Sequence, residues 1–223
     1  MLINTMRQYL IKNNFIEIHT PKLIGTASEG GADVFSVNYF GTKAYLAQSP
    51  QFYKQMAISS GFDRVFEIAP AFRAENSNSY RHSTEFTSFD VEIAYINSID
   101  ELIELEEDML IEGIKVVKQL YDKDIEYYLN TVIDVPKKPF PKLTLQEIYN
   151  ELEKTYNYYV DNGAKGDMNI ETEKLLSRYI LEKYNHQFVF ITEFDAKSRP
   201  FYHLRQNGVP QGSDLIWNGC EIT

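Results

Sequence analysis

The sequence is poor in cysteine and histidine and has no long hydrophobic run. Its 223 residues include one cysteine, Cys220, and four histidines. One cysteine cannot form an internal disulfide, which favours a reducing compartment, and these residues show no zinc-site spacing. No stretch approaches the roughly 20 apolar residues that a spanning helix needs, and the first residues lack a secretory-signal pattern. We therefore expect a cytoplasmic protein that has no membrane partner.

Positive charge is also scarce. The 22 lysines and arginines are outnumbered by 32 acidic residues, which gives a formal net charge of -10 at pH 7. This balance argues against a protein that binds nucleic acid mainly by bulk electrostatic attraction. Local basic contacts to a nucleic acid remain compatible with it.

Hydrophobic residues make up 43% of the chain and aromatic residues 14%, enough for one domain with its own core. Apolar periodicity predicts helices over residues 2–13, 49–59, 98–120 and 171–184, and a further helix after Thr144. Short β-rich runs predict strands over residues 15–18, 33–40, 44–47, 64–69, 86–95, 188–194 and 214–217. Half-buried strands with helices inserted between them indicate an α+β fold, with an antiparallel sheet flanked by helices.

Two helix starts carry capping-box signals. Ser98 with Glu101, and Thr144 with Glu147, have the spacing at which the side chains of the first and fourth residues cap each other's backbone. The acidic run 101–108 is typical of a solvated helix face. Residues 137–142 are expected to form a connector, and residues 154–166 a loop.

The segment from Phe72 to Glu92 concentrates chemically useful side chains. Alternation along the strand 86–95 places Phe86, Asp90 and Glu92 on one face and mostly apolar residues on the other. The run Phe72-Arg73-Ala74-Glu75, a polar loop and His82 precede this strand. A hairpin would therefore gather an arginine, a histidine, an aromatic ring and carboxylates on one surface.

Such a surface suits a nucleotide. A guanidinium holds phosphate oxygens through paired, charge-assisted hydrogen bonds, an aromatic ring stacks on a base, and a carboxylate accepts from an amine. The chain lacks the familiar glycine-rich phosphate loops, so side chains on a sheet would have to bind the phosphates. The residues alone leave open a salt-bridged surface hairpin that binds no ligand.

The motifs resemble those of a known family. Phe72-Arg73-Ala74-Glu75 followed by His82-Ser83-Thr84-Glu85-Phe86 resembles motif 2 of the class II aminoacyl-tRNA synthetases, and residues 72–92 resemble the archaeal and eukaryotic aspartyl-tRNA synthetases. Thr20-Pro21-Lys22-Leu23 is similar to motif 1, whose proline lies at the dimer interface. Residues 28–32 and 48–55 resemble the family's amino-acid pocket. The resemblance covers essentially the whole chain, more loosely over residues 124–166.

The resemblance implies roles for four residues in ATP binding. Arg73 would be the catalytic residue and would bind both the α-phosphate and the substrate carboxylate. Glu75 would meet the adenine amine, His82 would approach the γ-phosphate, and Phe86 would stack on adenine. Together they would hold ATP on the sheet.

It also implies an aspartate pocket and a metal site. Glu29, Gln48 and Asp90, together with Arg73, would hold the amino acid, and Lys54 would pair with the side-chain carboxylate of L-aspartate. Asp214 and Glu221 would be ligands of Mg²⁺ bound with ATP.

The expected activity is that of an aspartate–tRNA ligase. ATP and L-aspartate would form aspartyl-adenylate, and the aspartyl group would pass to tRNA(Asp), with tRNA(Asn) as a second acceptor left open. A homodimer through motif 1 is expected. Lys54 favours aspartate over asparagine, because an amide would leave its ammonium unmatched. The alternatives are an asparaginyl-tRNA synthetase and a synthetase paralogue that charges no tRNA.

The resemblance further implies segments that this sequence does not contain. In the family an anticodon-binding OB-fold precedes the catalytic domain, and a glycine-rich motif 3 follows it. We therefore expect residues 1–223 to form a single partial catalytic domain, truncated before motif 3 and inactive alone. Because motif 3 supplies a central strand, an exposed sheet edge is expected as well.

Overall fold

The computed structural model describes residues 1–28, 34–74, 83–160, 166, 168–199 and 202–223. Three predicted site residues, Glu29, Glu75 and His82, lie outside these ranges. The chain divides into two compact units, one spanning Ile3–Asn97 and the other combining Met1–Leu2 with Ser98–Thr223. Each unit is described by itself.

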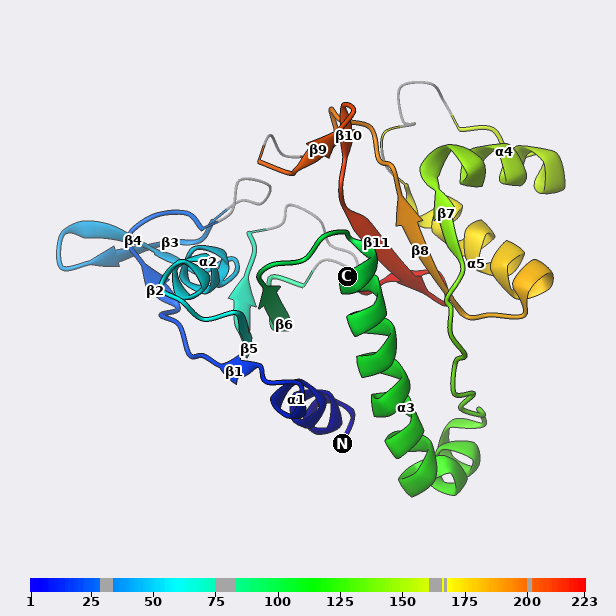
Figure 1. Cartoon of the computed structure of the whole chain (residues 1–223), viewed down its shortest axis with the longest axis horizontal. Helices are drawn as coiled ribbons and strands as arrows, with labels where there is room; N and C mark the ends of the chain where they lie inside the picture. The colour runs from blue at the N-terminus through cyan, green and yellow to red at the C-terminus, as the bar shows by residue number, and fades with distance from the viewer. Residues whose placement is uncertain (29–33, 75–82, 161–165, 167, 200–201) are drawn as a thin grey trace. The chain divides into compact units, whose positions relative to one another are not determined.

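The first unit is built around a long antiparallel hairpin (Figure 1). Its elements are α1 (Leu2–Lys12), β1 (Ile16–Glu17), β2 (Leu23–Ile24), β3 (Ser36–Tyr39), β4 (Thr42–Leu46), α2 (Gln51–Ser59), β5 (Arg64–Phe72) and β6 (Glu85–Ile93). Strand β5 pairs with β6 along its whole length and with β1 in parallel, whereas β2, β4 and β3 form a separate small sheet.

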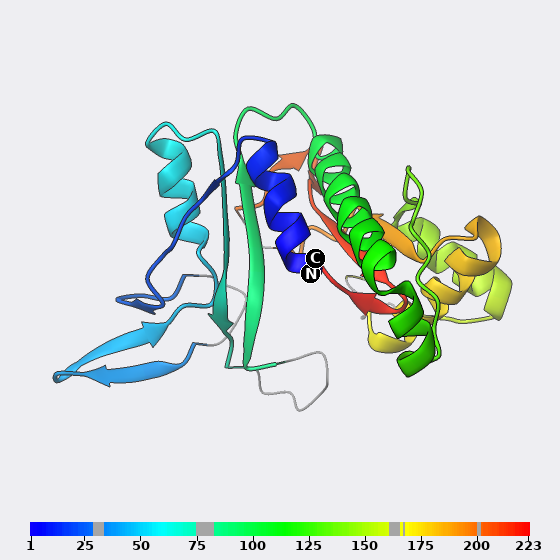
Figure 2. The ribbon, with the colours of Figure 1, turned by 90° about the horizontal axis from the view of Figure 1, so that it is seen from below.

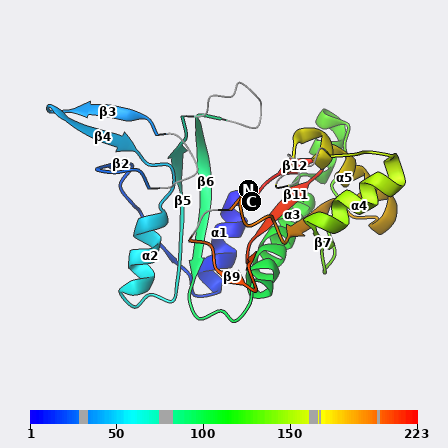
Figure 3. The ribbon, with the colours of Figure 1, turned by 90° about the horizontal axis from the view of Figure 1, so that it is seen from above.

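The two faces of the β5–β6 hairpin differ in character. On one face the buried ring of Phe66 stacks on Phe89, with ring centroids 6.3 Å apart. The register pairs Glu67 with Asp90 and Ala71 with Phe86, so these residues share the other face. Helix α2 packs against both strands (Figures 2 and 3). One face of the hairpin is thus core, and the other is available for polar side chains.

The second unit has a four-stranded sheet between helices. Its elements are α3 (Asp100–Leu129), β7 (Lys142–Thr144), α4 (Leu145–Tyr156), α5 (Ile170–Tyr184), β8 (Phe188–Thr192), β9 (Arg205–Gln206), β10 (Val209–Pro210), β11 (Ser213–Trp217) and β12 (Cys220–Glu221). The strand order is β12-β11-β8-β7, with α3 on one side and α4 and α5 on the other (Figure 2).

Alternation along β8 explains the two layers. Val189 and Ile191 join a buried cluster with α4 and α5. Phe188 points the other way and stacks between Phe140 and Trp217, at centroid distances of 4.9 and 5.1 Å. Because both faces of β8 are apolar, the strand is buried throughout its centre.

The α+β prediction is confirmed, with one difference in pairing. Most strand pairs are antiparallel, but β1 with β5 and β7 with β8 are parallel. The expected connector 137–142 extends into β7, because the amide of Phe190 donates to the carbonyl of Pro141 and draws this segment to the sheet edge. None of the described helices is both long and apolar enough to cross a membrane.

The helix starts gave one success and one error. Thr144 and Glu147 form the predicted capping box. The box at Ser98 is wrong: Ile99 takes the N-cap position with helical backbone angles, and no side-chain hydrogen bond caps the helix there. Helix α3 also runs to Leu129, beyond the predicted end near residue 120, and stops at Asn130, whose φ of 49° is left-handed.

The acidic run on α3 is only partly solvated, contrary to expectation. Glu107 is buried and accepts a hydrogen bond of 2.6 Å from the amide of Phe140. Lys138 forms an ion pair with Asp108 at 2.8 Å. Burial raises the pKa of Glu106 to about 7, against a lowering hydrogen bond from Thr223. The run anchors the 138–140 segment because its carboxylates meet that segment's amide and ammonium groups.

Candidate active site

Arg73 and Phe86 meet at one end of the β5–β6 hairpin. Arg73 directly follows β5, and its amide donates to the carbonyl of Thr84 at 3.0 Å, which continues the ladder by one step. Its guanidinium carbon lies 5.3 Å from the centroid of the Phe86 ring. This cation–π contact orients the guanidinium on the face of the hairpin. The predicted pair for phosphate and base is therefore assembled.

Lys54 and Asp90 meet farther along the same face. The Lys54 ammonium lies 3.1 Å from Asp90 and 3.5 Å from Glu92, and its side chain is only 11% exposed. Ser88 also donates a 2.5 Å hydrogen bond to Asp90. Without a substrate, the acids next to Lys54 provide its counter-charges. Glu92 was not among the predicted binding residues, although the alternation that selected Asp90 also places Glu92 on this face.

Gln48 fastens a neighbouring loop. Its side chain is fully buried, and its carbonyl oxygen accepts from the amide of Ser28 at 3.1 Å. The amide of Gln48 in turn donates to the Ser28 hydroxyl at 3.3 Å. Ser28 precedes the predicted residue Glu29, so Gln48 sets where that segment leaves the described part of the unit.

The face as a whole offers two kinds of chemistry. Phe86 and Asp90 are four residues apart on one strand, which corresponds to about 13 Å. A cation over an aromatic ring suits a phosphate and a base at one end. An ammonium between two carboxylates suits a ligand with both a carboxylate and an amine toward the other.

The predicted metal ligands share one hairpin in the second unit. Asn218 and Gly219 have φ of 50° and 80°, a type I′ turn that joins β11 to β12. The register opposes Ile216 and Glu221, so Glu221 and Asp214 lie on the same face.

Asp214 also has a partner that was not predicted. Its carboxylate forms a 2.5 Å ion pair with Arg199, whose guanidinium lies 3.7 Å over the ring of Phe194. Two carboxylates on one face fit the hard oxygen ligands of Mg²⁺, whose remaining positions are commonly filled by water and substrate phosphate. Within the described residues there is no cluster of three or more histidine, cysteine or acidic residues that would hold an ion by itself.

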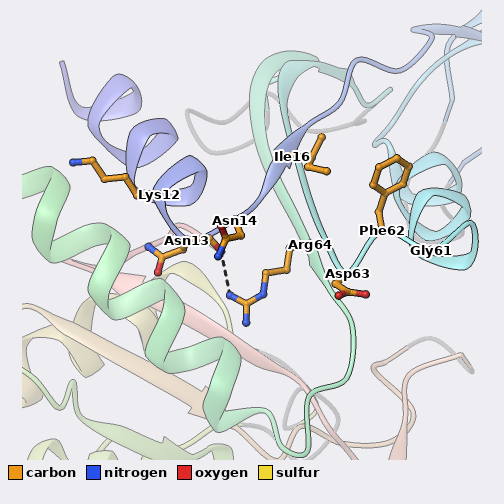
Figure 4. A pocket seen from close by; sticks show the side chains of 8 residues that line it. All are labelled: Lys12, Asn13, Asn14, Ile16, Gly61, Phe62, Asp63 and Arg64. Atoms are coloured by element: carbon orange, nitrogen blue, oxygen red, sulfur yellow. Dashed lines mark hydrogen bonds between the residues drawn. The ribbon is translucent and has the colours of Figure 1, made fainter.

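A cavity of about 480 Å³ lies elsewhere on the first unit (Figure 4). It is lined by Lys12, Asn13, Asn14, Ile16, Gly61, Phe62, Asp63 and Arg64. Arg64 donates to the carbonyl of Asn13 at 3.3 Å and begins β5, whereas Arg73 follows its end. No predicted site residue lines this cavity.

These features fit the core of a class II aminoacyl-tRNA synthetase, in which a hairpin carries the substrate-binding side chains. The chain belongs to the family described as tRNA synthetases class II (D, K and N), whose model matches residues 1–223. The family predicted from the motifs is thereby confirmed.

Three comparisons place the chain more closely. It is 40% identical over 223 residues to an aspartate–tRNA(Asp) ligase of Pyrococcus abyssi, with 97% of this chain and 49% of the relative covered. It is 39% identical to a cytoplasmic aspartate–tRNA ligase of Homo sapiens, with 99% and 45% covered. A solved asparaginyl-tRNA synthetase of Pyrococcus horikoshii, complexed with asparaginyl-adenylate, matches with a TM-score of 0.83 and 28% identity over 97% of this chain and 49% of that one. The chain spans about half the length of the curated relatives it matches.

Proposed function

We propose that the full-length protein is an aspartate–tRNA ligase, which activates L-aspartate with ATP and transfers the aspartyl group to tRNA(Asp). The observation that carries the proposal is the shared face of the β5–β6 hairpin. This face presents Arg73 against Phe86, and Lys54 against Asp90. The similarity to aspartate–tRNA ligases over nearly the whole chain supports it.

The first step requires two anions to meet. The α-carboxylate of aspartate attacks the α-phosphorus of ATP, the bond to the bridging oxygen breaks, and pyrophosphate leaves with its electron pair. No general base is needed, because the nucleophile is already ionised. Arg73 would lie between the two reacting groups and offset their repulsion through charge-assisted hydrogen bonds. Phe86 would hold the adenine ring and so fix the phosphate in line.

Asp214 and Glu221 would hold Mg²⁺ with the ATP phosphates. The ion supplies positive charge that offsets the charge of the phosphates. Arg199 contributes from the protein side, because its ion pair fixes the Asp214 carboxylate on the strand face. Asp214 is thus held in one orientation before a nucleotide arrives.

Selection of aspartate would depend on Lys54. Its side chain is mostly buried, so an asparagine amide in place of the substrate carboxylate leaves the ammonium poorly matched, at a cost of about 1–3 kcal/mol. The fold does not distinguish the two amino acids, since the asparaginyl enzyme of Pyrococcus horikoshii has a closely similar structure. The distinction therefore has to come from side chains.

The remaining partners follow from the same proposal. We assign tRNA(Asp) as the acceptor, with tRNA(Asn) as a second acceptor to be tested, and a homodimer formed through Thr20-Pro21 of motif 1. We also assign a cytoplasmic location, which the name of the human relative states for that protein.

Pyrophosphate exchange with the full-length protein tests the proposal. Radiolabelled pyrophosphate should enter ATP when L-aspartate and Mg²⁺ are present, and asparagine should support at least about tenfold less exchange. Exchange that prefers asparagine would assign the protein to the asparaginyl enzymes. An absence of exchange with either amino acid would favour a paralogue that charges no tRNA.

A further inference from the structure

Glu67 is a buried carboxylate with an unusually complete set of partners. Its side chain is 2% exposed and lies on β5. One oxygen accepts from the amide of Thr20 at 2.6 Å. The other accepts from the Thr20 hydroxyl at 2.7 Å and from the Lys22 ammonium at 2.9 Å. Lys22 also donates to the Thr20 hydroxyl at 2.7 Å. Motif 1 is thereby fastened to the strand that leads to Arg73.

Glu67 also stands directly across from the amino-acid pocket. The register of the hairpin pairs it with Asp90, so the two carboxylates share one face as immediate cross-strand neighbours. Like charges in such a position destabilise a sheet unless each is neutralised. Here each has its own lysine, Lys22 for Glu67 and Lys54 for Asp90. The face therefore carries a row of alternating charges.

The row reaches the wall of the pocket through the backbone. The carbonyl of Lys22 accepts from the amide of Ala47 at 2.9 Å, and Ala47 immediately precedes Gln48. The carbonyl of Ala47 accepts from the amide of Phe72, the residue before Arg73. The Lys22–Glu67 pair thus sits at the junction of motif 1, Gln48 and the end of β5.

We propose that the Lys22–Glu67 ion pair is a positioning pair that balances the charge of the aspartate pocket. It touches no substrate, but it cancels the carboxylate next to Asp90, so Lys54 remains available to attract a second carboxylate. The inference rests on the proposed function and adds a specificity determinant to it. Packed apolar residues would stabilise the fold as well as a buried ion pair does, so stability alone gives no reason for the charges.

The charges and the fastening can be separated by substitutions of opposite sign. Lys22→Met leaves Glu67 uncompensated beside Asp90, so the KM for aspartate should rise about tenfold, while kcat and the KM for ATP stay within about threefold. Glu67→Gln removes the negative charge and should not raise the KM for aspartate. The double variant Lys22→Met with Glu67→Gln restores neutrality and should return this KM to within about threefold of the unmodified protein.

The experiment is pyrophosphate exchange with these three variants of the full-length protein. Arg7→Met, which breaks the Arg7–Glu17 pair elsewhere in the unit, is the matched control and should leave the KM for aspartate unchanged. A Lys22→Met variant with unchanged KM would overturn the inference, as would equal increases in both single variants and the double variant. If Lys22→Met does not accumulate, a raised KM in Glu67→Gln and in the double variant contradicts it just as directly. Absence of exchange in the unmodified protein would instead overturn the proposed function.

Discussion

The two hairpins that carry the predicted site residues differ in how their acids are balanced. On the β5–β6 face of the first unit, Asp90 is neutralised by Lys54, a predicted pocket residue on α2. On the β11–β12 hairpin of the second unit, Asp214 is neutralised by Arg199, a residue outside the predicted set. A substrate entering the first site exchanges one carboxylate for another at Lys54. A cation entering the second site shares Asp214 with an arginine.

The largest effect is expected at Arg73. Arg73→Ala removes the group that offsets the repulsion of the two reacting anions, so pyrophosphate exchange should fall by about a thousandfold or more. Arg64→Ala is the matched control, because Arg64 also lies over an aromatic ring, that of Phe15 at 5.5 Å, but at the other end of β5. Normal exchange in Arg73→Ala, or an equal loss in Arg64→Ala, would contradict the assignment of this face.

Lys54 should show the next largest effect. Lys54→Met leaves Asp90 and Glu92 without their shared cation and removes the partner of the substrate carboxylate. We expect the KM for aspartate to rise about a hundredfold, with the KM for ATP nearly unchanged. Steady-state kinetics for both substrates measure the difference. Equal changes in the two KM values would indicate general damage to the site and not loss of a specific contact.

A smaller effect is expected on the second hairpin. Asp214→Asn should raise the Mg²⁺ concentration for half-maximal exchange about tenfold, because an amide is a weaker ligand than a carboxylate. Asp195→Asn, at an exposed acid of the same unit, is the control and should leave the Mg²⁺ requirement unchanged. An unchanged requirement in Asp214→Asn would remove this hairpin from the metal site and would leave only the first hairpin as a functional site.

The smallest effect concerns stability and pH. Burial raises the pKa of Glu106 to about 7, so the folded state holds its proton more tightly than the unfolded state does. Its contribution to stability is present at low pH and is lost as pH rises from about 4.5 to about 7. Glu106→Gln should therefore raise the free energy of unfolding relative to the unmodified protein by about 2 kcal/mol more at pH 8 than at pH 4.5. Calorimetry at both pH values, with the exposed Glu126→Gln as control, measures the difference.

Much of the first site was readable from the sequence because strand alternation is local. The period of two along residues 86–92 placed Phe86 and Asp90 on one face, and the register confirms it. Glu92 follows from the same rule. Glu67 does not, because its partners Thr20 and Lys22 are more than 40 residues away and no local pattern connects them.

The second site was less predictable for the same reason. The order of Asp214 and Glu221 was recognised, but the Arg199 ion pair depends on a loop that folds back on β11. The Asn-Gly pairs at 207–208 and 218–219 are strong hairpin signals, and they mark the β9–β10 and β11–β12 turns that were not predicted. The false capping box at Ser98 arose because the four-residue spacing fits a helix start that lies two residues earlier than the observed one.

The most direct test of the central claim is a crystal structure of the full-length protein with a non-hydrolysable analogue of aspartyl-adenylate. The adenine should stack on Phe86, the phosphate mimic should contact Arg73, and the side-chain carboxylate should contact Lys54, with Asp90 turned toward the amino group. An analogue bound in the cavity between Lys12 and Arg64, or anywhere away from the β5–β6 face, would contradict the account.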